Sequence, residues 1–168
     1  MGWESSIRDV NLSANFTYFP SPGTTLDFGL STIQHQFDPG SNQFDDQFNV
    51  PNSRALEHGF FVSLEKEIGK SLLLEVGTRW SLFQNIGEAT VFEFDQNFFS
   101  CDTTRYRSGE VYNSFNNLEP RFSARYALDK KQSIKLSYNR MAQYLHMLAN
   151  STLSFTAFDV WYPSGPNV

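Results

Sequence analysis

The clearest pattern along the chain is a strict alternation of apolar and polar residues, which occurs in three separate stretches. Between Leu72 and Leu82, for example, every second position is apolar except Thr78, and Glu75, Gly77 and Arg79 stand between them. A period of two indicates an extended strand with one apolar and one polar face. The three stretches therefore predict an all-β protein.

Each alternating stretch is interrupted once by a short run of turn-forming residues. The three interruptions are residues 20–23 (PSPG), 69–70 (GK) and 129–132 (DKKQ). Proline, glycine, aspartate and lysine at such places favour tight hairpins. We therefore predict three hairpins, at approximately 6–35, 58–84 and 118–148, which together form an antiparallel meander of about six long strands.

The connections between hairpins are much longer than the turns within them. They cover approximately 36–57 and 86–117, and a further stretch at 149–168 follows the third hairpin. Short turns at one end, long loops at the other and strands of about a dozen residues are typical of outer-membrane barrels. The pattern thus favours a partial outer-membrane β-barrel domain over 1–168. A soluble β-sandwich that binds a ligand or glycan also has one apolar and one polar face, and it stays open as the alternative.

Composition narrows the function classes. The net charge is −5, without the excess of lysine and arginine typical of nucleic-acid-binding proteins, so nucleic acid is not expected as a partner. No apolar run of about 18 residues exists, which excludes membrane-spanning helices. Neither a Gly-x-Ser-x-Gly elbow nor a phosphate-binding glycine loop is present, and we expect no enzyme activity and no cofactor. His35 and His58 flank the first long loop and could approach each other around zinc. Two histidines do not complete a zinc site, so we expect two solvent-exposed histidines instead.

The last third of the chain contains a series of short motifs in a fixed order. They are LEPRFSARY at 118–126, SIKLSYNR at 133–140, QYLH at 143–146, NST at 150–152, DVWYPS at 159–164 and PNV at 166–168. This series resembles the barrel region of TonB-dependent receptors of the Bacteroidetes type, and residues 1–117 resemble it more loosely through their hairpin rhythm.

The resemblance implies a location and a function. The family fold is a large transmembrane barrel closed around a plug domain, and such transporters have about 22 strands. It implies that this chain is a segment of the barrel domain in the bacterial cell outer membrane. The implied function is energised uptake of a nutrient such as a siderophore, glycan or peptide. The implied partners are outer-membrane lipid, the plug domain and TonB of the complete receptor, and a surface lipoprotein.

Two groups of residues are candidates for binding, and none is a candidate for catalysis or for metal binding. Aromatic residues in the loops either pack loop on loop or contact a ligand, and the best candidates are Trp161, Tyr162, Phe98, Phe99 and Tyr106. Polar residues on the wet face of the strands either pair across strands or contact a plug or a polar solute in the lumen. The residues predicted to face the lumen are Glu65, Glu75, Arg79, Glu119, Arg121 and Arg125.

Overall fold

The structure is a computed structural model that describes residues 5–39, 52–94, 100–149 and 159–165. The described residues form β-strands joined by turns, and they include no helix. The strands are β1 (Ser6–Ser21), β2 (Thr24–Asp38), β3 (Ser53–Ile68), β4 (Leu72–Ile86), β5 (Ala89–Phe94), β6 (Ser100–Tyr106), β7 (Val111–Ala127), β8 (Ser133–Asn139), β9 (Leu145–Ala149) and β10 (Asp159–Pro163).

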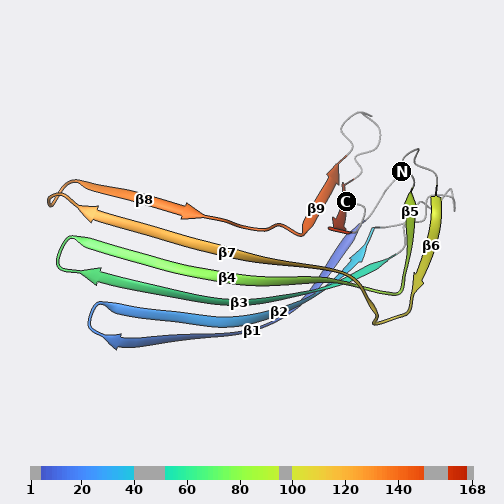
Figure 1. Ribbon diagram of the computed structural model, residues 1–168, viewed down its shortest axis with the longest axis horizontal. Helices are drawn as coiled ribbons and strands as arrows, with labels where there is room; N and C mark the ends of the chain where they lie inside the picture. The colour runs from blue at the N-terminus through green and yellow to red at the C-terminus, as the bar shows by residue number, and fades with distance from the viewer. Residues whose placement is uncertain (1–4, 40–51, 95–99, 150–158, 166–168) are drawn as a thin grey trace.

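Six of these strands form one antiparallel sheet in the order β1-β2-β3-β4-β7-β8. The all-β antiparallel meander of six strands predicted from the sequence is therefore confirmed. The three tight turns lie together at one end of the sheet, on the left of Figure 1. Gly23 and Gly69 occupy two of these turns with φ angles of 71° and 66°, a backbone conformation that residues with a side chain rarely adopt.

The strands reach further into the predicted loops than the turn signals suggested. Strand β2 continues to Asp38, β4 continues to Ile86, and β7 begins at Val111. Most of the predicted loop at 86–117 is also strand, because β5 and β6 form a separate hairpin within it. Its alternation is too short to stand out in the sequence, but its threonine, valine and phenylalanine residues have high strand propensity.

The third hairpin ends earlier than predicted. Pairing between β7 and β8 stops at Arg121 and Asn139, and a last backbone hydrogen bond joins the Arg140 amide to the Pro120 carbonyl at 3.1 Å. Beyond Arg140 the chain leaves the sheet, and β9 pairs with β10 in a second small hairpin. Figure 1 shows both small hairpins at the loop end of the sheet.

The strand register separates the sheet into two faces of opposite character. The face that carries Val76 is here named the outer face. Its apolar residues are Val10, Leu12, Ala14, Phe16, Tyr18, Leu26, Phe28, Leu30, Leu56, Phe60, Val62, Leu64, Ile68, Leu72, Leu74, Val76, Trp80, Leu82, Ile86, Leu118, Phe122, Ala124, Tyr126, Ile134, Leu136 and Tyr138. Many stay uncovered in the described structure: Val76 is 53% exposed and Leu136 is 65% exposed. Lys66 near the turns and Arg8, Asp38 and Arg54 at the loop end are the charged residues that the described strands place on this face.

The apolar residues of the outer face form a band of limited height. Towards the loops polar residues enter the same face at Gln34, Gln36 and Gln84, next to the apolar residues Leu56 and Ile86. In β4 the apolar stretch runs from Leu72 to Leu82, which is about 34 Å at about 3.4 Å per residue. A strand tilted by about 40° would span about 25 Å with this length, the height of the apolar band of an outer-membrane barrel.

The opposite face, here named the inner face, carries the small buried core. Phe37, Ala55, Phe83 and Tyr144 form its centre, and it lies near the loop end. Tyr144 reaches it because the chain leaves the sheet after Arg140, and its ring stacks on Phe83 with 4.9 Å between centroids. The core thus lies between the sheet and the segment at 140–145, rather than between two sheets.

Candidate functional site on the inner face

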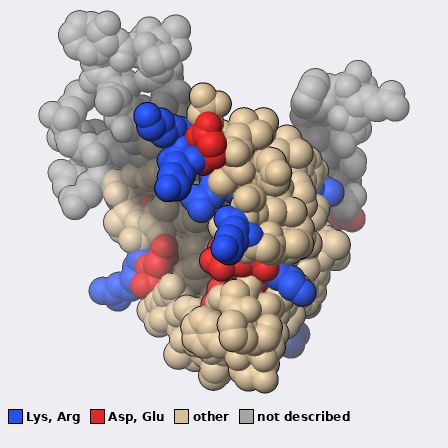
Figure 2. Space-filling model, turned by 90° about the vertical axis from the view of Figure 1, so that its left-hand side faces the viewer, with Lys and Arg blue, Asp and Glu red and all other residues tan. Residues whose placement is uncertain are grey.

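The residues predicted to line a lumen all lie on the inner face. Glu65 is opposite Glu75, Arg79 is opposite Glu119, and Arg121 and Arg125 alternate with outward-facing neighbours on β7. Figure 2 looks at the turn end of the molecule and shows acidic and basic side chains of several residues around a hollow. The sequence pattern therefore places this set on one surface, and the structure adds the contacts among its members and their neighbours.

One chain of polar contacts crosses the first four strands. The His35 Nδ1 atom lies 2.8 Å from the Asp9 carboxylate on β1, and His35 Nε2 lies 3.8 Å from the Glu57 carboxylate on β3. On β4, Arg79 Nη2 donates to the other oxygen of Glu57 at 3.1 Å. His35 is only 3% exposed. This result corrects the expectation of a solvent-exposed histidine at position 35, because the register of β1 and β2 places Asp9 directly opposite it.

His58 lies on the other face of the sheet. It pairs with Thr32 and Leu82 on the outer face, and its Nδ1 atom is 3.1 Å from the Thr32 hydroxyl. His35 and His58 therefore point to opposite faces and do not form a common zinc site. The described residues also contain no group of three histidine, cysteine, aspartate or glutamate side chains that could hold a metal ion.

The electrostatic environment favours the charged form of His35. This residue lies beyond the apolar band, since its neighbours on the outer face are Gln34 and Gln36. Burial lowers the pKa of the imidazole, but the nearby Glu57 carboxylate and the hydrogen-bonded Asp9 carboxylate outweigh this effect, and the net pKa lies above its ordinary value. The charged ring can thus join β1 to β3 across β2.

A pH titration of stability tests this arrangement. Because the folded-state pKa of His35 is raised, its stabilisation is complete below the unfolded pKa of about 6.5 and is lost as the pH rises through the folded value. The free energy of unfolding should therefore fall as the pH rises above about 6.5, and His35→Gln should remove that slope. His58→Gln is the control and should keep it. Equal slopes in wild type and His35→Gln would refute the charged link.

A second group of contacts surrounds Glu119, which is buried. The Ser81 hydroxyl lies 2.8 Å from the Glu119 carboxylate and 2.7 Å from the Tyr144 hydroxyl, and Asn117 Nδ2 donates to the same tyrosine oxygen at 2.9 Å. The Tyr144 carbonyl accepts a hydrogen bond from the Ser164 amide at 2.7 Å. Tyr144 therefore connects the inner face of the sheet to the segment that follows β10.

Gly59 makes room for the Arg79 side chain on this face. A Cβ atom at Gly59 would lie 2.7 Å from Arg79 Nη2 and 2.8 Å from the Ser31 hydroxyl, both too close for normal packing. The guanidinium therefore passes over a position that must lack a side chain in order to reach Glu57.

Gly59→Ala should push Arg79 away from Glu57. We expect a loss of about 1–2 kcal/mol in the free energy of unfolding, the usual range for mild overpacking. Denaturant titration of the folded chain measures it. Gly165→Ala is the matched control, because nothing lies within 4 Å of the added Cβ. A Gly59→Ala variant as stable as the control would show that Arg79 has another equally good position.

The structure brings some of the predicted loop aromatics together and leaves others apart. Tyr106 on β6 packs on Tyr112 at the start of β7, with 5.5 Å between ring centroids. Burial raises the pKa of Tyr112, and the neighbouring Tyr162 on β10 raises it further. Tyr106 and Tyr162 thus approach the same residue, which the sequence did not single out as a candidate. Trp161 is opposite Met147 in the β9–β10 pair. Phe98 and Phe99 lie outside the described residues.

Sequence reasoning missed the residues that organise the inner face: His35, Asp9, Glu57, Ser81 and Tyr144. The alternation places Asp9, His35 and Ser81 on the wet faces of strands, so a pairing of β1 with β2 in the correct register would have joined Asp9 to His35. Glu57 falls in the predicted loop at 36–57, which the structure replaces there by strand β3. Tyr144 gave no comparable signal, because nothing in the QYLH motif at 143–146 indicates that the chain turns onto the inner face.

Among the described residues, no helix has the length and apolar character that a membrane crossing requires. Comparison with known proteins gives no further guide to this site: no protein-family model, no curated protein and no solved structure matches the chain. The resemblance to TonB-dependent receptors therefore stays a prediction, and the two faces of the sheet are the basis for assigning a function.

Proposed function

We propose that this chain is a segment of the β-barrel of a TonB-dependent outer-membrane receptor that takes up a nutrient across the bacterial outer membrane. In this proposal the outer face lies against lipid and the inner face lines the lumen. The tight turns lie on the periplasmic side, and the small hairpins β5–β6 and β9–β10 lie on the external side with the loops.

The uncovered apolar band of the outer face is the observation that carries the proposal. Soluble proteins rarely expose a continuous apolar surface of this extent. Val76, Leu136 and Phe16 are each more than half exposed, and beyond the band the same face is interrupted by polar residues such as Gln34 and Gln84. A band of about 25 Å with polar residues beyond it matches a hydrocarbon layer.

The inner face and the sheet edges support the same proposal. Charges of both signs on the inner face suit an aqueous lumen. Within the described residues, β1 and β8 are the edge strands of the sheet, and each pairs on one side only. In a larger barrel, further strands would pair with both edges. A β-sandwich would instead cover the Val76 face with a second sheet about 10 Å away. The described residues place no second sheet there.

Density-gradient flotation tests the membrane part of the proposal. The chain, refolded in the presence of phosphatidylcholine vesicles, should float with the lipid and resist extraction by high salt, because apolar contacts rather than charges hold it. Recovery of a soluble monomer at the bottom of the gradient, with β-structure by circular dichroism, would contradict the proposal and favour the sandwich.

The transport part requires the cell that encodes the chain. Deletion of its gene should abolish energised uptake of one nutrient, and restoring the gene should recover it. Uptake that persists after dissipation of the proton-motive force in the wild type would contradict a TonB-dependent mechanism. A screen of labelled siderophores, glycans and peptides identifies the nutrient.

A further inference from the structure

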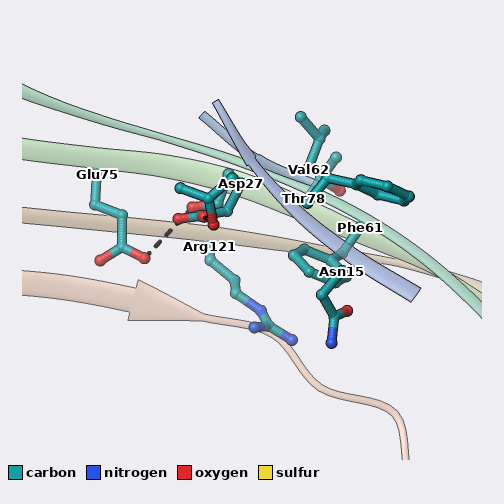
Figure 3. A pocket seen from close by; sticks show the side chains of 11 residues that line it. Asn15, Asp27, Phe61, Val62, Glu75, Thr78 and Arg121 are labelled. Carbon is teal, nitrogen blue, oxygen red and sulfur yellow. Dashed lines mark hydrogen bonds between the residues drawn. The ribbon is translucent and has the colours of Figure 1, made fainter. Parts of the chain in front are cut away.

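The inner face contains a pocket that is separate from the His35 and Glu119 contacts. It is an open depression lined by residues of β1, β2, β3, β4 and β7, with a volume of about 320 Å³. Its wall is formed by Asn15, Asp27, Phe61, Glu75, Gly77 and Arg121. Figure 3 shows Asp27, Glu75, Phe61 and Arg121 on one side of the sheet, while Val62 points to the other.

Small residues keep the middle of this pocket open. Asp27 on β2 and Arg121 on β7 lie in one row across the sheet, with Ser63 and Gly77 between them. Since neighbouring strands lie about 4.8 Å apart, the backbones at the two ends of this row are about 14 Å apart. A Cβ atom at Gly77 would come within 2.9 Å of the Ser63 hydroxyl, so a larger residue would fill the gap.

The pocket wall carries charges of both signs that do not pair with each other: Asp27 on β2 and Glu75 on β4 are acidic, and Arg121 on β7 is basic. The Thr17 hydroxyl donates to Asp27 at 2.6 Å, and the Ser63 and Ser123 hydroxyls donate to Glu75 at 3.4 and 3.3 Å. Within the described part of the chain, no ion pair joins Arg121 to Asp27 or Glu75. Figure 3 shows the Arg121 side chain extending away from Glu75.

We propose that this pocket binds a small zwitterionic solute, with its carboxylate on Arg121 and its ammonium group between Asp27 and Glu75. A guanidinium presents paired donors that match a carboxylate, and the two acidic side chains offer acceptors to an ammonium group. The Phe61 ring supplies an apolar wall for the body of the solute. A simple anion or cation would satisfy one side alone, whereas a zwitterion satisfies both.

The span of the pocket sets the size of the solute. A free dipeptide is about 7 Å long when extended, and the Arg121 side chain covers much of the remaining distance from β7. The pocket lies on the inner face, so its occupancy depends on the sheet and not on what covers the outer face. The inference therefore goes beyond the proposed function and can fail independently of it.

Calorimetric titration with alanyl-phenylalanine tests the inference on the chain folded in detergent micelles. The free dipeptide should bind saturably. The N-acetylated and the C-amidated forms should each bind at least about tenfold more weakly, because each loses one charge-assisted contact. Equal binding of the three forms, or no saturable binding at millimolar concentrations by the folded chain, would overturn the inference.

Two variants test which side chains bind the carboxylate end and the ammonium end of the solute. Arg121→Gln should bind the free and amidated dipeptides equally, and Asp27→Asn should lose most of its preference for the free over the acetylated form. Lys135→Gln is the matched control, because Lys135 is on the inner face but does not line the pocket. Circular dichroism confirms that each variant folds. Unchanged selectivity in Arg121→Gln would also overturn the inference, and flotation with lipid would still report on the membrane proposal separately.

Discussion

Val76→Arg should destabilise the lipid-inserted chain by about 2–4 kcal/mol, the cost of an arginine in the middle of the lipid face of a barrel. Val76 is central on the outer face, between Leu64 on β3 and Phe122 on β7. At this depth the guanidinium would have no water to contact, and the described neighbours offer it no acidic partner. Urea titration of the chain folded in vesicles, followed by tryptophan fluorescence, measures the change.

Ser137→Arg is the matched control for this substitution. Ser137 lies on the inner face of β8, opposite Ser123, and it is exposed. An arginine there would lie in water, where the charges of the neighbouring Lys135, Arg121 and Arg125 are screened, so we expect a change within about 0.5 kcal/mol. Similar costs for the two arginines would contradict the assignment of the outer face to lipid.

Phe83→Ala should remove the centre of the small core and cost about 3–5 kcal/mol in the free energy of unfolding. Phe83 is fully buried, and its ring stacks on Tyr144. The substitution leaves a cavity under the segment at 140–145, so we also expect faster proteolysis near Tyr144. Denaturant titration and limited proteolysis of the folded chain provide the two readouts.

Phe60→Ala is the control that shows whether the cost of Phe83→Ala comes from the burial of Phe83 or from the loss of any phenylalanine. Phe60 is half exposed on the outer face, opposite Trp80. Its truncation should cost less than Phe83→Ala and should not affect proteolysis near Tyr144. A larger loss at Phe60 than at Phe83 would mean that the core does not lie on the inner face near the loops.

The strands of this fold and the two faces of its sheet can be predicted from the sequence, because alternation is a local signal. Leu72 to Leu82 reads as a strand without knowledge of any neighbour, and the polar residues between them fall on the opposite face. The tight turns then fix which strands are adjacent. For this reason the predicted polar set from Glu65 to Arg125 lies on one surface in the structure.

The contacts that make a site could not be read in the same way. The link between Asp9 and His35 depends on the register of two strands, and a shift of one residue would place the two side chains on opposite faces. The position of Tyr144 against the inner face depends on where the chain leaves the sheet after β8. The turn residues and the alternation do not indicate that point. The charged gap between Asp27 and Arg121 requires the order of four strands.

The function proposed for the chain depends on what contacts the outer face, and the fluorescence of Trp80 reports this directly. Trp80 is 43% exposed on that face, within the apolar band. Replacing Trp3 and Trp161 by phenylalanine leaves Trp80 as the single tryptophan. In vesicles containing lipids brominated along the acyl chain, we predict strong quenching of Trp80, and weaker quenching in a variant that retains Trp161 alone. Trp80 fluorescence that is unaffected by brominated lipid in the folded chain would contradict the account.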